Sequence, residues 1–458
     1  MHTLAQLQSG ALKHATYIKI AESLNHFPTE LYSLADSLEV LDLSDNQLTT
    51  LPADFSRLHK LKIFFASNNP FDHLPEVLGL CPNLEMIGFK ANQISTVAEN
   101  ALPKKTRWLI LTDNKLKTLP NSMGALHHLQ KIMLAGNQLQ TLPNSMAQCS
   151  NLQLVRLAAN QLTALPDWLL TLPKLSWLAF SGNPLCGLTK FEHVSNTDTP
   201  PAPLTKVSLD DVKLGDLLGQ GASGLIYKAT INADLIKEHA FEAEVAVKLF
   251  KGTVTSDGYP LDELNACMIA GCHPNLVSIV AEVHGINHQN QSQKGLVMPL
   301  IPNDYFNLGQ PPTFASCTRD CFDRQFKLPI KKVVKILLAV TDALQHLHQK
   351  QLCHGDLYAH NILINPTASV LLSDFGAASH FKPLPSHQQI ALQIIEKRAL
   401  GHLLEDLLNV CPDDLNHPAI IATLREIHLT LTHSKSAGNA HLSLTELTTQ
   451  LKDILIKL

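Results

Sequence analysis

Apolar residues recur in one frame, LxxLxLxxNxLxxLP, from Leu38 to about Cys186. Each copy of the frame is 22 or 23 residues long, because its Asn stands at positions 46, 69, 92, 114, 137, 160 and 183. Apolar residues at fixed offsets within such a period predict stacked units that bury one continuous core. Within each copy the LxL pair predicts a short strand. The Asn after it is expected to turn the chain and to bond the backbones of adjacent coils with its amide.

This frame resembles the leucine-rich repeats of the 23-residue type. The resemblance implies an α/β horseshoe solenoid with seven repeats, which we place at residues 38–190. Residues 1–37 contain only a degenerate, shortened frame (YIKIAESLNHFP), and we expect them to form an N-terminal cap. The fourth copy departs from the frame, since Thr106 replaces its opening leucine.

Residues between the framework leucines are expected to face the concave surface of the solenoid. Aromatic and Arg side chains on an exposed patch favour a protein-binding site. We therefore predict that a protein substrate or regulator binds this surface at Phe65, Trp108, Ile110, Met133, Arg156 and Trp177. The alternative is that part of the surface packs against the rest of the chain.

The repeat pattern stops near Gly187, and a sequence of another kind begins. Residues 191–211 concentrate Asn, Thr, Asp and Pro, and Pro200, Pro201 and Pro203 favour an extended, semi-rigid spacer. We expect a linker there and a second domain over residues 212–458.

The second domain opens with an apolar strand and a glycine-rich turn, in which Gly219, Gly221 and Gly224 have the spacing GxGxxG. Such spacing alone is a weak signal. Here it predicts a β-hairpin whose backbone can approach phosphate groups because no Cβ intervenes. Lys248 then interrupts the strand-like run EVAVKLF. Most lysines on strands are solvated edge residues, so neither element is decisive without the next one.

The third element is a helix-period segment, Val333–Leu347, followed by His354-Gly355-Asp356, then Asn361, then Asp374-Phe375-Gly376. The runs NILI and SVLLS between them predict a strand pair. This order places a carboxylate that can receive a hydroxyl proton before an amide and a second carboxylate that can hold Mg²⁺ on phosphates.

Taken together, these motifs resemble the eukaryotic-type protein kinase domain, an α+β bilobal fold, over residues 212–458. The resemblance implies ATP and Mg²⁺ as cofactors. It implies catalytic roles for Asp356, Lys248 and Asn361, with Asn361 and Asp374 as metal ligands. Glu263 would pair with Lys248, and Asp262 is the second candidate. The implied ATP-binding residues are Gly219, Gln220, Gly221, Ala222, Ser223, Gly224, Ile226, Tyr227, Ala246, Lys248, Glu263, Met298, Pro299, Ile301 and Leu363.

Several positions depart from the kinase pattern. Gly355 replaces the family's Arg, which normally pairs with a phosphorylated activation loop, so we expect activity without such phosphorylation. Tyr358 stands where Ser/Thr kinases carry a Lys, and His360 stands nearest to an Arg of tyrosine kinases. The segment after Gly376 is short and lacks the APE motif. It leads to a helix expected to begin near Ile394, with Glu396 where Asp is usual. The resemblance implies a hinge at Pro299-Leu300-Ile301, and residues 303–329, between this hinge and the helix-period segment, match no element.

Composition narrows the remaining choices. A formal net charge of −4 gives no indication of nucleic acid or an anionic membrane as a partner. The nine Cys are scattered, which favours reduced thiols, and we see neither a signal peptide nor a run of 18 apolar residues. We therefore expect a cytoplasmic protein.

Three functions fit the sequence. The first is an ATP-dependent protein kinase that acts on protein hydroxyls, Ser/Thr rather than Tyr, with the repeats choosing a partner or substrate. The second is a pseudokinase scaffold that binds proteins through both domains, although Lys248, Asp356, Asn361 and Asp374 are all present. The third is a small-molecule phosphotransferase, which HGDLxxxN and the missing APE also resemble.

Overall fold

The structure is a computed structural model of the 458-residue chain. It describes residues 1–187, 204–221, 224–232, 234–236, 242–252, 254–255, 257–286, 292–412, 416–433 and 442–458. The chain divides into two compact units. The first comprises Met1–Leu175 and Asn183–Leu185, and the second comprises Ser176–Gly182 and Cys186–Leu458.

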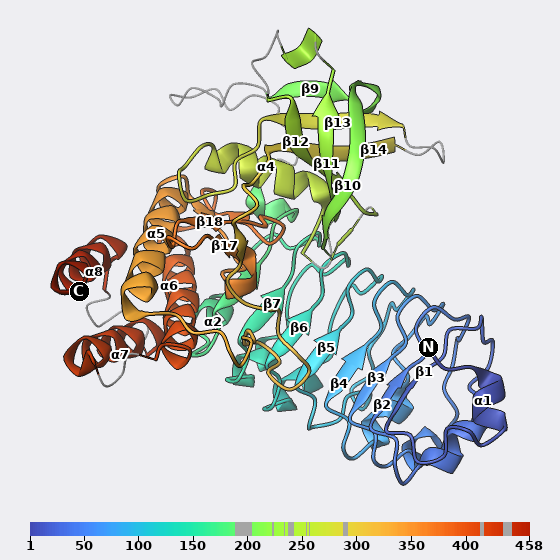
Figure 1. Cartoon of the computed structure of the whole chain (residues 1–458). Helices are drawn as coiled ribbons and strands as arrows, with labels where there is room; N and C mark the ends of the chain where they lie inside the picture. The colour runs from blue at the N-terminus through green and yellow to red at the C-terminus, as the bar shows by residue number, and fades with distance from the viewer. Residues whose placement is uncertain are drawn as a thin grey trace. The chain divides into compact units, whose positions relative to one another are not determined.

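Short parallel strands, one for each coil, form an eight-stranded sheet in sequence order (Figure 1). They pair in matched register, for example Leu41 of β2 with Phe64 of β3. The strands are β1 (Tyr17–Lys19), β2 (Val40–Asp42), β3 (Ile63–Phe65), β4 (Met86–Gly88), β5 (Trp108–Ile110), β6 (Lys131–Met133), β7 (Leu154–Arg156) and β8 (Trp177–Ala179). The α/β solenoid inferred from the repeat frame is thereby confirmed. Strand β1 lies within residues 1–37, where the degenerate frame predicted a cap.

The Asn that recurs in each copy of the frame forms the expected bridge between coils. Asn137 donates from Nδ2 to the carbonyl oxygens of Leu111 at 2.8 Å and Leu134 at 2.9 Å, and its Oδ1 accepts from the Leu116 N–H at 3.0 Å. Asn69 and Asn160 make the same kind of contacts in their own coils. These bonds satisfy backbone groups that would otherwise be buried without partners.

On the other side of the coils the chain forms short helical turns rather than long helices, except between β4 and β5, where the described residues form no helix. Their apolar side chains pack behind the strands. At Thr106, which replaces a leucine, the buried hydroxyl donates to the Pro103 carbonyl at 2.7 Å. The turns are α1 (Leu4–Gln8), η1 (Thr29–Leu34), η2 (Phe55–Arg57), η3 (Glu76–Leu80), η4 (Asn121–Ala125), η5 (Asn144–Gln148), α2 (Asp167–Leu170) and η6 (Pro184–Cys186).

The residues proposed for partner binding differ in exposure. Phe65, Trp108, Ile110 and Met133 are half-buried. Arg156 and Trp177 are each only 2% exposed. The predictions that Arg156 and Trp177 are open to a partner are wrong, because both side chains are buried. The indole of Trp177 is packed inside the second unit, where Nε1 donates to the Leu357 carbonyl.

The second unit begins with a six-stranded sheet in the order β10-β11-β12-β14-β13-β9. Its buried face is lined mainly by valines, among them Val212, Val245 and Val283. Helix α4 (Pro260–Ala270) follows β12 and has Pro260 in its first turn, a favourable place for proline. The strands are β9 (Thr205–Ser208), β10 (Val212–Gln220), β11 (Gly224–Ile231), β12 (Glu244–Phe250), β13 (Ala281–Ile286) and β14 (Ser292–Pro299).

Part of the predicted linker contributes to this sheet. Residues 205–208 form β9, which pairs in parallel with β13, and Val207 is fully buried in the sheet's core. The turn η7 (Leu209–Asp211) then leads into β10. Residues 188–203, which hold the three linker prolines, lie outside the described residues.

The remainder of the unit is mostly helical. Helix α5 (Ile330–Gln349) contains the predicted segment Val333–Leu347 and buries its apolar stripe, including Val333, Leu337 and Leu344. It lies beside α6 (Figure 1). The helices after it are η8 (Ala359–Asn361), α6 (Ser386–Asn409), α7 (Pro418–Thr432) and α8 (Leu444–Lys457), and the strands are β15 (Phe306–Asn307), β16 (Leu352–Cys353), β17 (Ile362–Ile364), β18 (Val370–Leu372) and β19 (Ser379–His380). The predicted strand pair is β17 and β18. Helix α6 begins at Ser386, directly after Pro385, and not near Ile394 as expected.

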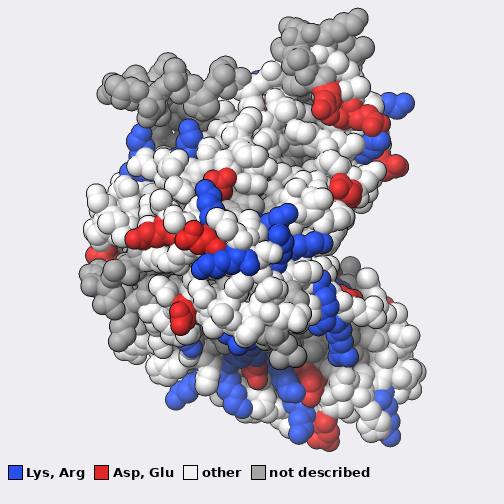
Figure 2. All heavy atoms as spheres, turned by 60° about the vertical axis from the view of Figure 1, so that its left-hand side comes forward, with Lys and Arg blue, Asp and Glu red and all other residues white. Residues whose placement is uncertain are grey.

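Charged residues are distributed without a dominant sign on the face drawn in Figure 2. Among its described residues, basic and acidic side chains are interspersed with larger uncharged areas. A surface that binds nucleic acid would require Lys and Arg side chains to cluster in one patch. In the part of the chain that the structure describes, no helix combines the length and apolarity needed to cross a bilayer.

Candidate active site

Lys248 occupies the centre of the candidate site. It lies on β12, opposite Ile226 of β11 and Leu296 of β14, and is only 7% exposed. Its ammonium forms a short ion pair with Glu263 of α4 and lies 3.9 Å from a carboxylate oxygen of Asp374. Burial alone lowers the pKa of Lys248, but the charges of Asp374 and Glu263 outweigh it and hold this pKa above its ordinary value. The ammonium therefore stays charged, as phosphate binding would require.

The glycine-rich turn joins β10 to β11. The Gly221 N–H donates to the Gly224 carbonyl at 3.0 Å. A Cβ on Gly224 would lie 2.6 Å from the Leu249 carbonyl oxygen, so packing alone requires a glycine there. At Gly219 and Gly221, no described atom lies within 4 Å of the place a Cβ would occupy. That open space would let a phosphate approach the backbone. Ala222 and Ser223 lie outside the described residues.

The residues assigned to the adenine side lie on neighbouring strands. Ala246 of β12 is in register with Met298 of β14, and Pro299 ends that strand. Ile226 and Tyr227 are on β11. Ile301 follows β14, and Leu363 is the middle residue of β17.

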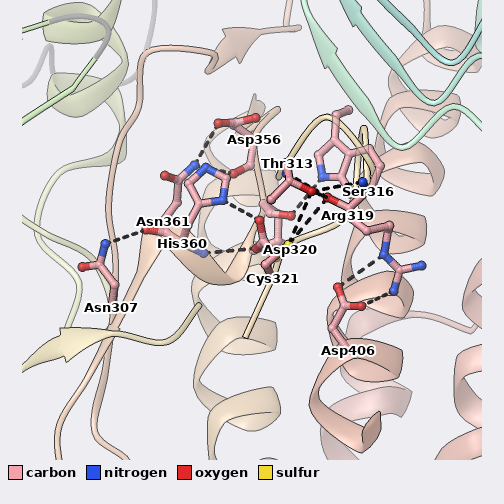
Figure 3. Close-up of polar contacts among 12 residues, drawn as sticks. Asn307, Thr313, Ser316, Arg319, Asp320, Cys321, Asp356, His360, Asn361 and Asp406 are labelled. Carbon is pink, nitrogen blue, oxygen red and sulfur yellow. Dashed lines mark hydrogen bonds and ion pairs between the residues drawn. The ribbon is translucent and has the colours of Figure 1, made fainter. Parts of the chain in front are cut away.

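The catalytic-loop candidates are held together by side-chain bonds. Asn361 donates both of its amide hydrogens to Asp356, to Oδ2 at 2.8 Å and to the backbone oxygen at 2.9 Å (Figure 3). Its own amide oxygen is left as the atom that could bind a cation. The backbone oxygen of Asn361 accepts from the Ser373 N–H at 2.9 Å, which brings Asn361 near Asp374. An amide oxygen and a carboxylate are ligands that suit Mg²⁺.

His354 fixes the loop that carries Asp356 through hydrogen bonds of both ring nitrogens. It is fully buried, its Nδ1 accepts from the Asp356 N–H at 3.3 Å, and its Nε2 lies 3.0 Å from the Ser373 carbonyl. Nε2 therefore carries the hydrogen. Glu396 of α6 accepts from the backbone N–H of His354 at 2.6 Å and of Gly355 at 3.0 Å, and from His348 at 2.6 Å. Glu396 thus fixes the backbone that precedes Asp356.

Comparisons with known proteins bear on this geometry. The family model described as protein tyrosine and serine/threonine kinase matches residues 212–393. Leucine-rich-repeat models match residues 37–58, 104–162 and 127–185. The chain combines leucine-rich repeats with a protein kinase domain.

Curated relatives of the kinase domain are distant. The tyrosine-protein kinase receptor TYRO3 of Danio rerio is 25% identical over 169 residues, which is 36% of this chain and 18% of that protein. Fibroblast growth factor receptor 1 of Pleurodeles waltl is 24% identical over 212 residues, or 44% of this chain and 24% of that protein. The chain thus spans less than a quarter of the length of either relative. A leucine-rich-repeat protein of Leptospira interrogans is 26% identical, with a TM-score of 0.31, over 36% of this chain and 48% of that one.

Residues 303–329, which matched no element in the sequence, lie between β14 and α5 and contact the loop that carries Asp356 and Asn361. Asp320 accepts from the ring of His360 at 2.6 Å and from its backbone N–H at 3.2 Å (Figure 3). Its neighbour Arg319 is bonded to Asp406 and Glu405 of α6. Burial lowers the pKa of His360, but the hydrogen bond and charge of Asp320 outweigh it and raise this pKa. No sequence pattern indicated Asp320.

The two thiols of the same stretch do not suggest a metal centre. Cys317 is buried, and Cys321 is 3.7 Å from the Ser316 hydroxyl. All nine cysteines lie among the described residues, and each is a thiol rather than half of a disulfide. Among described residues, a group of three side chains that could converge on a metal comprises His348, Cys353 and Glu396, and Glu396 already serves the backbone of the catalytic loop there.

Proposed function

We propose that the kinase domain transfers the γ-phosphate of ATP to hydroxyl groups of proteins. The observation that carries the proposal is the burial of Lys248 between Glu263 and Asp374. Burying ions usually costs stability, so the needs of packing do not explain why a charged lysine is buried between two carboxylates. Its position suits a cation that holds phosphates.

Each remaining residue has a role in this proposal. The turn from Gly219 to Gly224, with Ala222 and Ser223, covers the phosphates, and Ile226, Tyr227, Ala246, Met298, Pro299, Ile301 and Leu363 surround the base. Asn361, through its amide oxygen, and Asp374 would hold Mg²⁺, which neutralises charge on the phosphates when bound. Asp356 would accept the proton of the attacking hydroxyl. The hydrogen bonds from Asn361 keep its carboxylate oriented for that step.

We propose Ser and Thr ahead of Tyr as acceptors. His360 stands near a position where tyrosine kinases carry an Arg, but here Asp320 pairs with its ring. The positive charge at that position is therefore neutralised within the domain. We also propose the boundaries 1–37 for the cap, 38–190 for the repeats, 191–211 for the linker and 212–458 for the kinase domain, with Thr205–Ser208 of the linker pairing as β9 in the kinase sheet.

A small-molecule acceptor is a second candidate, favoured by one observation. Only residues 381–385 connect β19 to α6, which leaves little chain for a platform that binds a peptide.

One labelling experiment tests these proposals. Purified protein would be incubated with γ-labelled ATP and Mg²⁺, with and without small alcohols and amines. We expect label on protein Ser or Thr, and a loss of at least about 100-fold in Lys248→Met, because a preorganised charge that faces the reacting phosphates is removed.

Lys228→Met is the matched control, because Lys228 lies on the adjacent strand in an exposed ion pair with Glu244. Its rate should equal that of the wild type. Label only on the small molecules would support the second candidate. Nucleotide binding without any transfer would contradict both and support a scaffold.

For the repeats we propose a protein partner on the concave surface, centred on Phe65, Trp108, Ile110 and Met133. Apolar residues there are half-buried, and the ammonium of Lys131 lies 4.2 Å from the centre of the Trp108 ring. Trp108→Glu should weaken binding of the substrate identified by labelling at least about 30-fold, as loss of a central aromatic contact does. Calorimetric titration would measure it, and unchanged affinity would contradict this proposal.

A further inference from the structure

The kinase domain has a very short chain where other members of the family carry an activation loop. Strand β19 ends at His380, and α6 begins at Ser386. Five residues span at most roughly 17 Å when fully extended. At that length the connection offers little chain to fold back over the catalytic loop as an activation loop does.

Another segment packs against the catalytic loop. Ser176–Gly182, which contains β8, counts with the second unit by its contacts, although it precedes the range that the kinase family model matches. The indole of Trp177 donates from Nε1 to the Leu357 carbonyl at 3.0 Å. It also stacks on the ring of Tyr358, with centroids 4.5 Å apart and planes inclined by 8°. Leu357 and Tyr358 directly follow Asp356, so Trp177 restrains the backbone next to the proposed base.

The backbone of the same segment helps to explain why position 355 is a glycine. Its φ is +73°, a conformation that favours glycine. A Cβ there would also lie 2.6 Å from the Ala377 oxygen and 2.9 Å from the Leu178 oxygen. Any larger residue, including the Arg of other kinases, would displace β8. The cavity lined by Leu178, Gly355 and Leu392 has a volume of about 10 Å³, at the lower limit for one water, so the packing is close.

Two further contacts reach the elements on either side of the site. The Phe180 N–H donates to the hydroxyl of Ser379, on β19, at 3.0 Å. Gly182, at a φ of +68°, lies against α4, since a Cβ there would be 2.5 Å from Asp262 Oδ2 and 2.8 Å from the Tyr259 ring. Helix α4 carries Glu263, the partner of Lys248. The segment thus contacts the catalytic loop, the strand after the DFG sequence and the helix that orients Lys248.

We propose that Ser176–Gly182 takes the place of an activation segment and that Trp177 is a positioning residue for Asp356. The inference rests on the proposed phosphotransfer. It implies that the kinase domain reaches its active geometry without phosphorylation, since the contacts that order it are an aromatic stack, a neutral hydrogen bond and close packing. It also implies that residues 212–458 alone lack part of the catalytic apparatus.

The test compares full-length variants. Trp177→Phe keeps the aromatic ring but removes the donor to Leu357, and Trp177→Ala removes both contacts. We expect kcat to fall about 10-fold in the first and about 100-fold in the second, while ATP affinity and the one-to-one stoichiometry of nucleotide binding stay within twofold of wild type. Damage to the fold alone would lower the stoichiometry instead.

Trp168→Phe is the matched control, because the Trp168 Nε1 makes no hydrogen bond to any described residue. It should behave as wild type. Wild-type kcat in Trp177→Ala would overturn the inference, as would a loss confined to ATP affinity.

A second measurement separates this inference from the proposed function. Hydrogen exchange of the peptide containing residues 354–361 should accelerate in Trp177→Ala, while exchange of β12 stays unchanged. If the wild type transfers no phosphate, the proposed function fails, but the exchange result still tests the contact. Unchanged exchange at residues 354–361 would overturn the inference whatever the activity.

Discussion

Asp262 and Glu263 are adjacent acidic residues on α4 with opposite surroundings. Successive residues on a helix point about 100° apart, so only one of the two can face Lys248. Glu263 does so, and Asp262 does not. Asp262 Oδ2 is buried and makes no hydrogen bond to a described residue, and burial raises the pKa of Asp262 to about 6.

This residue gives a prediction about pH and stability. An acid whose folded-state pKa lies above its unfolded value of 3.8 binds more protons when folded, so its contribution to stability falls as pH rises from about 4 to 6. Above about pH 6 the buried carboxylate of Asp262 is charged, and it then lowers the stability of the folded protein by its full amount. Asp262→Asn should therefore raise the melting temperature of the full chain at pH 8 by a few degrees and leave it nearly unchanged near pH 4. A lower melting temperature at pH 8 would show that Asp262 has a stabilising partner.

Some residues of the site could be identified from the sequence, and others could not. The kinase residues Lys248, Asp356, Asn361 and Asp374 were identifiable because their order and spacing along the chain are characteristic. Asp320 was not, since a lone Asp in a stretch without periodicity carries no information about its partner. For Trp177 the repeat frame indicated which face of the strand the indole occupies, but not what covers that face.

At the scale of elements, the frame Asn residues connect successive coils. Asn137 serves three backbone groups, and all three bonds are buried. Removing such a side chain leaves buried donors and acceptors unpaired, at a cost of roughly 1–3 kcal/mol for each group. Because adjacent coils depend on one another, the loss should affect the unfolding of the whole array.

Asn137→Ala should accordingly lower the free energy of unfolding of the repeats by about 2–4 kcal/mol. Urea unfolding followed by circular dichroism would measure the shift in midpoint. The control is Asn151→Ala, since Asn151 also bridges coils, to the His127 carbonyl at 2.7 Å, but at the exposed surface. Equal shifts for the two variants would contradict the role assigned to burial.

Some helices and strands were predicted from the sequence, and others were missed. Periodicity located strands β2 to β8 and helix α5, because a repeated apolar pattern determines both the type of element and its buried face. For the region of β1, where the frame is degenerate, the periodicity predicted a cap but no strand. It also missed β9, because Thr205–Ser208 has one buried apolar residue, Val207, among polar ones. Helix α6 begins eight residues before the expected start. Its first two turns were missed because they contain mostly polar residues and so show no apolar periodicity.

At the scale of the whole molecule, the chain pairs an array of repeats with a kinase domain, and its parts contribute different functions in our account. The repeats would select a protein, and the kinase domain would act on it. Segment Ser176–Gly182 belongs by sequence to the repeat frame and by its contacts to the second unit. If it orders the catalytic loop as inferred, the second unit includes a positioning segment that comes from the last copy of the repeat frame.

Asp356 is the proposed base for phosphate transfer from ATP. Transfer of label from γ-labelled ATP to protein should be measured for wild type and Asp356→Asn at saturating nucleotide. We predict a decrease of about 10²–10⁴-fold in rate, the usual contribution of a positioned base, with nucleotide affinity retained. Equal rates in the two proteins, or no transfer by wild type despite bound ATP and Mg²⁺, would contradict the account.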